Sequence, residues 1–212
     1  MDYSPLWISL RTAFAATGFA VAIGIVAAYY VNRLGKVLKG VADGILTLPM
    51  VLPPTVVGFC LLVFFGSRGP AGQFFMNVLH TKVVFPWYAP IIASTVVAVP
   101  LMYRTMRGAF EQFHRTLIYS AQTLGLTNTF IFWRIILPNC RHSLIAGTVL
   151  AFARGLGEFG ATMMLAGNIP GRTTTMSVAV YSAMAAGNNA LAFKWVLIDL
   201  IISFVMMLVM NL

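Results

Sequence analysis

Five apolar runs dominate the sequence, and each is long enough to cross a lipid bilayer as a helix. A helix rises about 1.5 Å per residue, so roughly 20 residues span the hydrocarbon core. The five runs are residues 13–31, 45–65, 87–103, 144–165 and 195–212. We therefore expect an all-α, polytopic membrane protein with about five transmembrane helices, which form a single transmembrane domain over residues 1–212.

Charged residues are too scarce to cover a water-soluble surface. They make up 9% of the chain, against about 25% in soluble domains. The net charge is +9, a surplus that would suggest nucleic-acid binding in a soluble protein. Here the cations are scattered between the apolar runs, so we interpret them as topology signals in the bilayer and expect no nucleic-acid partner.

The cations are distributed unequally between the two sides of the membrane. If five spans alternate, segments 32–44 and 104–143 share one side with eight Lys and Arg residues, and the opposite side holds five. Loops rich in Lys and Arg tend to stay in the cytoplasm. We therefore expect the N-terminus outside the cell and both of these segments inside.

The long segment between the third and fourth runs is typical of two short helices around a glycine. Residues 110–124 have a composition compatible with a helix, and Gly125 can adopt the left-handed conformation that ends one. Thr127 or Asn128 can cap a second helix over residues 129–137, which Pro138 is expected to end. Residues 110–138 are thus predicted to form a cytoplasmic helix–glycine–helix loop.

This loop resembles the coupling signature of permease subunits of ATP-binding-cassette (ABC) importers. In that signature a glycine follows an alanine-containing helix, and Ile-x-Leu-Pro follows the glycine after nine intervening residues. The matching residues are Ala121, Gly125, Ile135, Leu137 and Pro138. Tyr119 and Ser120 stand where the family has Glu and Ala. The resemblance implies that an ATPase subunit is contacted by Ser120, Ala121, Leu124, Gly125, Ile135, Leu137 and Pro138.

Two further stretches resemble molybdate-type permeases and their sulfate relatives, namely residues 48–58 and residues 154–161 with 167–171. The resemblance extends over essentially the whole chain. It implies a homodimer in the inner membrane of a bacterium or archaeon, with two cytoplasmic nucleotide-binding ATPase subunits and an extracytoplasmic oxyanion-binding protein. ATP and Mg would be bound by the ATPase, so no cofactor is expected in this chain. The implied cargo is molybdate, with tungstate and sulfate as alternatives.

Five residues are candidates for the lining of a translocation pathway: Pro49, Pro53, Pro54, Arg154 and Glu158. The prolines remove amide donors within a membrane span, which predicts a broken helix along a polar path, or else a kink packed against neighbours. Arg154 and Glu158 are four residues apart, so they can pair on one helical face. That pair either shapes the field around a passing anion or is purely structural, with Asp199 as a possible third member.

Nothing in the sequence indicates an enzyme. The phosphate-binding pattern Gly-x4-Gly-Lys-Ser/Thr is absent, and His80, His114 and His142 are widely separated. We therefore expect neither a catalytic nor a metal site. An ion-coupled carrier with Glu158 and Asp199 as proton sites is an alternative from another class, although it leaves the Gly125 loop unexplained. A membrane scaffold is a third, against which the proline-rich second run argues.

Overall fold

The computed structural model describes residues 2–80 and 82–211, and every regular element in this part of the chain is a helix. Three helices are long and apolar enough to cross a membrane: α1 (Ser4–Val31), α5 (Ala89–Gln112) and α12 (Asn189–Asn211). They correspond to the first, third and fifth apolar runs. Two bent helix pairs bring the number of candidate spans to as many as five, as the sequence predicts.

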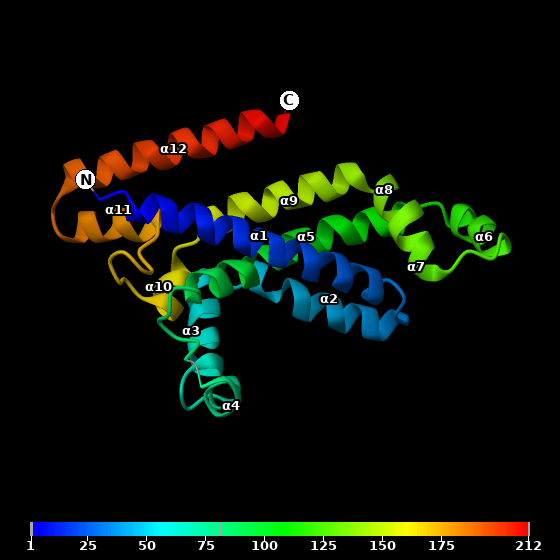
Figure 1. Cartoon of the computed structure of the whole chain (residues 1–212), viewed down its shortest axis with the longest axis horizontal. Helices are drawn as coiled ribbons and strands as arrows, with labels where there is room; N and C mark the ends of the chain where they lie inside the picture. The colour runs from blue at the N-terminus through cyan, green and yellow to red at the C-terminus, as the bar shows by residue number, and fades with distance from the viewer. Residues whose placement is uncertain (1, 81, 212) are drawn as a thin grey trace.

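The second apolar run is divided at its prolines. α2 (Lys36–Val51) and α3 (Pro54–Phe65) meet at an angle of 114°, with Leu52 and Pro53 in extended conformation between them. Pro54 is the first residue of α3. A backbone N–H at this position has no acceptor within the helix, so its absence in proline costs no hydrogen bond. Pro49, in contrast, remains inside α2. Figure 1 shows α3 running across the direction of the other long helices toward α4 (Pro70–Leu79).

The fourth apolar run differs from the prediction of one continuous span over residues 144–165. α9 (Arg141–Leu156) ends at Gly157, and the separate helix α10 (Gly160–Ala166) begins after Phe159. Glu158, between them, accepts a hydrogen bond on its carboxylate from the backbone N–H of Ala161 at 2.7 Å. An acidic acceptor satisfies a free amide at a helix start, so the new helix is stabilised where the sequence shows only a glycine-rich stretch.

The centre of the molecule is formed by α1, α5 and α9, which run alongside one another, while α12 lies at the outer edge and contacts α11 (Met176–Ala185) (Figure 1). Small residues line the face of α1 that is buried in the bundle: Ala13, Ala16, Ala20, Gly24 and Ala28. At Gly24 an added Cβ would lie 2.7 Å from Cγ of Met102 and 3.0 Å from the backbone N of Tyr103. α1 and α5 are therefore in direct backbone-to-backbone contact.

The segment after α5 lies at the end of the molecule opposite the N-terminus (Figure 1). It consists of α6 (Arg115–Thr123), α7 (Asn128–Ile131), a π-helical turn (Phe132–Ile136) and α8 (Leu137–Asn139). Gly125 separates α6 from α7 with φ of 76°. Thr127 caps α7, its hydroxyl accepting from the N–H of Phe130 at 3.3 Å.

Two sequence predictions for this segment are wrong in detail. Residues 110–124 are not one helix, because α5 ends at Gln112 and α6 begins at Arg115. Pro138 does not end its helix either: the helical run continues to Asn139 and then bends by 75° into α9. The π-helical turn before Pro138 explains this. In a regular α-helix the proline ring would collide with the backbone carbonyl of the preceding turn, and the wider π-turn leaves room for the ring.

Candidate functional site

The break between α2 and α3 lies next to the break between α9 and α10. A Cβ added at Gly160 would lie 3.0 Å from Cβ of Pro54, and one added at Gly58 would lie 2.7 Å from Cα of Ala161. The start of α3 is thus packed directly against the start of α10, with only hydrogen atoms at both glycines. Of the three candidate prolines, the structure brings Pro54 to the second break, whereas Pro49 stays one segment earlier on α2.

Arg154 and Glu158 form an ion pair at this junction, with Nη1 of Arg154 2.5 Å from Oε2 of Glu158. Glu158 is 1% exposed and Arg154 is 31% exposed. The carboxylate therefore has two functions, since one oxygen neutralises Arg154 and the other caps α10. In the described residues no cation lies within ion-pair distance of Asp199, so the suggested third member is not part of the pair.

The residues expected to contact an ATPase divide into exposed and buried groups. Leu124 is 78% exposed, and Ser120, Gly125 and Pro138 are also exposed. Ala121 is 4% exposed and belongs to a buried cluster with Ile131 and Ile136, while Ile135 and Leu137 are partly buried. Ala121 therefore packs α6 against the following helices, and its side chain is not accessible to a partner protein.

The exposed apolar surface of this segment extends beyond the residues that match the coupling signature. Besides Leu124, large exposed apolar side chains are Leu117, Phe130 and Trp133. Leu117 on α6 and Leu124, which directly follows this helix, are seven residues apart and so lie on the same side of it, with Ser120 between them. That spacing is visible in the sequence once the limits of α6 are known.

A second group that the sequence did not reveal joins α2 to the last turns of α5. Asp43 pairs with Arg107 and accepts a hydrogen bond from the Tyr103 hydroxyl, while Lys39 lies 2.7 Å from Glu111. Arg107 also contacts Glu111 at 3.0 Å. Of these contacts, only the Arg107–Glu111 pair is indicated by the sequence, because its two residues are four apart and can meet on one helix.

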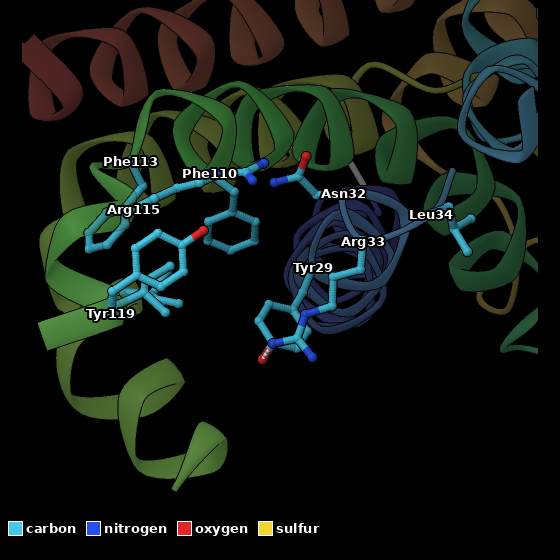
Figure 2. A pocket seen from close by; sticks show the side chains of 10 residues that line it. Tyr29, Asn32, Arg33, Leu34, Phe110, Phe113, Arg115 and Tyr119 are labelled. Carbon is cyan, nitrogen blue, oxygen red and sulfur yellow. Dashed lines mark hydrogen bonds between the residues drawn. The ribbon is translucent and has the colours of Figure 1, made fainter. Parts of the chain in front are cut away.

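A cavity of about 480 Å³ lies between the end of α1 and the start of α6. In Figure 2, Tyr29 and Arg33 stand on one side, and Phe113, Arg115 and Tyr119 stand on the other. The Arg33 guanidinium lies 4.0 Å from the centre of the Tyr29 ring and donates a hydrogen bond to the hydroxyl of the same residue. The sequence places these two groups at least eighty residues apart, so no local pattern predicts the cavity.

A family comparison identifies the class of this fold. Residues 20–212 match the family described as the inner membrane component of binding-protein-dependent transport systems. The chain belongs to this family. It is accordingly a multi-pass inner-membrane protein and the transport component of such a system, which confirms that it is a transport subunit and not an enzyme.

Individual relatives agree over nearly the full chain. The Bacillus subtilis protein YvgM, named for a molybdenum transport system permease, is 40% identical over 205 residues, or 97% of this chain and 90% of that protein. The molybdenum transport system permease protein ModB of Escherichia coli K12 is 36% identical over 98% of this chain and 91% of its own length.

Solved structures support the fold. An inward-facing MetNI methionine ABC transporter contains a chain with a TM-score of 0.75 at 16% identity, covering 98% of this chain and 91% of that one. A bacterial ABC transporter that imports alginate gives 0.76 at 17% identity, covering 100% of this chain and 79% of that one. At such low identity these likenesses establish the arrangement of helices alone.

Proposed function

We propose that this chain is the membrane-spanning permease subunit of an ABC importer for molybdate. The observation that carries the proposal is the similarity to molybdenum transport permeases at 36–40% identity over 97–98% of the chain. In this proposal two copies form the translocation pathway, two cytoplasmic ATPase subunits supply the energy, and an extracytoplasmic protein delivers the anion. ATP and Mg bind to the ATPase.

The segment from α6 to α8 is proposed as the contact with the ATPase. Leu117, Leu124, Phe130 and Trp133 present large apolar side chains to the outside of the monomer at one end of the bundle. Exposed apolar surface of this kind marks an interaction site in a protein segment that reaches beyond the membrane. Ala121 and Thr127 fix the shape of the segment, and the docking surface lies on Leu124, Gly125 and their exposed neighbours.

The anion is proposed to pass along the junction of α3 and α10. Interrupted helices leave backbone groups without helical partners, and at membrane depth such groups are tolerated where they are buried in protein or face a water-filled path. The break between α2 and α3 meets the break between α9 and α10 there, next to Arg154 and Glu158. Docking at the cytoplasmic end would move the spans between inward- and outward-facing states, with the N-terminus outside.

Family membership weighs against the other classes considered. An ion-coupled carrier and a scaffold have no need of a delivery protein, whereas this family consists of binding-protein-dependent components. Tungstate and sulfate remain the alternative cargoes, and competition with molybdate uptake distinguishes them.

A pair of glycine substitutions tests the docking role. Gly125 and Gly187 have φ of 76° and 74°, and no atom lies within 4 Å of a Cβ added at either. Valine at each therefore introduces the same backbone strain, about 1–2 kcal/mol. In proteoliposomes with the ATPase and the binding protein, we expect ATP-dependent molybdate uptake to be lost in Gly125→Val and retained in Gly187→Val.

Three results would count against the proposal. Normal uptake by Gly125→Val would remove the docking assignment, and equal loss in both variants would reduce it to general destabilisation. Absence of ATP-dependent molybdate uptake by the unmodified complex would remove the cargo assignment.

A further inference from the structure

We propose that the cavity between α1 and α6 binds the phosphate headgroup of an anionic phospholipid. We call it the headgroup cavity; it is lined by Tyr29, Arg33, Phe110, Phe113, Arg115 and Tyr119, among others (Figure 2). Its volume of about 480 Å³ lies in the range of about 300–1,000 Å³ that is usual for small-molecule sites.

The two arginines of the cavity carry charge that the protein does not neutralise. No acidic residue is among the residues that line it. Over the described ranges, neither Arg33 nor Arg115 belongs to an ion pair, whereas Arg107 and Arg154 each contact a carboxylate. Two cations that face one cavity without a carboxylate are suited to an external anion, and a guanidinium matches the geometry of a phosphate group.

Arg33 is held in place toward the cavity. Its guanidinium lies over the ring of Tyr29, at 4.0 Å from the ring centre, and is hydrogen-bonded to the Tyr29 hydroxyl. A guanidinium has five N–H donors, so several remain available for a ligand. Because the stack orients the side chain in advance, binding of an anion costs little additional side-chain entropy.

The position of the cavity favours a lipid over a soluble ligand. Tyr29 lies in the last turn of α1 and Arg33 lies just beyond this helix, which is long enough to span the membrane, so the cavity lies at the level where the helix leaves the bilayer. Basic pockets between transmembrane helices at this level bind anionic headgroups, and tyrosines are frequent there. Phe110 and Phe113 add apolar lining that an inorganic anion does not use but the glycerol and first acyl carbons of a lipid do.

The cavity also lies on the opposite side of α6 from the proposed ATPase contact. Leu117, Ser120 and Leu124 are three and four residues apart and share one side of this helix, whereas Arg115, Ile118 and Tyr119 line the cavity from the other side. An ATPase docked on Leu124 would therefore not cover the cavity. A bound lipid would brace α6 against α1 from behind.

The test compares two double variants that each remove two positive charges. Arg33→Gln with Arg115→Gln empties the cavity of cations, and Arg134→Gln with Arg141→Gln removes two exposed arginines from the same end of the molecule outside it. Each complex of permease and ATPase is reconstituted in nanodiscs of phosphatidylcholine and phosphatidylglycerol, extracted into detergent, and examined by native mass spectrometry for retained lipid. Thermal unfolding shows that both variants are folded, and the single variant Arg33→Gln replaces the first pair if it is not.

We expect the unmodified complex to retain phosphatidylglycerol in preference to phosphatidylcholine. Each cation near an anionic lipid contributes a factor of about five in affinity, so the cavity variant should bind phosphatidylglycerol about 30-fold more weakly. The Arg134/Arg141 control should keep the retained lipid. Equal loss in both double variants, no preference for phosphatidylglycerol, or displacement of the lipid by millimolar inorganic phosphate or molybdate would each overturn the proposal. None of these outcomes bears on molybdate uptake, which the glycine variants test separately.

Discussion

The ion pair between Arg154 and Glu158 predicts an unequal response to removal of its two members. Arg154→Met would leave the Glu158 carboxylate, which is 1% exposed, without a counter-ion, and breaking a buried pair in this way costs about 3–5 kcal/mol. Glu158→Gln would leave Arg154, which is 31% exposed and faces water if it lines the proposed path, while the amide oxygen can still accept from Ala161. We expect this second change to cost only about 1–2 kcal/mol.

The double variant Arg154→Met with Glu158→Gln removes both charges. It should recover most of the loss caused by Arg154→Met, because no unpaired charge remains in the junction. The free energy of unfolding of all four proteins is measured by titration with sodium dodecyl sulfate in mixed micelles. Equal effects of the two single changes would refute the reasoning from exposure, and a double variant no more stable than Arg154→Met would show that the residues do not interact.

Transport by the double variant then decides between the two roles left open for the pair. Glu158 already neutralises Arg154 in the structure, so we expect the stable double variant to take up molybdate at a rate close to that of the unmodified protein. A variant that folds and docks the ATPase but transports poorly would instead assign Arg154 to the path of the anion.

Three further predictions concern packing, charge and orientation. Gly58→Ala should destabilise the protein by about 1–3 kcal/mol, since its Cβ would lie 2.7 Å from Cα of Ala161, whereas Gly40→Ala on α2, with open space around it, should stabilise it slightly in the same titration. Asp43→Asn should cost about 1–2 kcal/mol and more than Glu111→Gln, because each carboxylate has two partners but that of Asp43 is the less exposed; equal costs would contradict this. In a background without Cys60 and Cys140, a cysteine at Ser67 should react with an impermeant thiol reagent applied outside intact cells and one at Asn128 should not, and the reverse pattern would invert the proposed topology.

The sequence predicts those features that local chemistry determines. Run length identifies the straight spans α1, α5 and α12, and consecutive prolines identify the break before α3. Gly125 has the left-handed conformation expected of a glycine after a helix, and Thr127 caps the next one. In each case the deciding interaction lies within a few residues of the chain.

Features that depend on distant partners escaped prediction. The break after α9 has no proline, and it becomes stable only because Glu158 caps α10 and Gly160 lets Pro54 approach. Pro138 stays helical through a π-turn that composition does not reveal. The headgroup cavity requires the end of α1 and the start of α6 to meet, so neither segment alone contains the information.

The small-residue face of α1 determines how movement can spread through the protein. At Gly24 the backbone of α1 is so close to α5 that the two helices cannot slide past each other without a collision. We therefore expect the two helices to tilt together. α5 is about 36 Å long and joins α6 through only two residues, so a displacement of α6 at one surface is carried mechanically to the opposite surface.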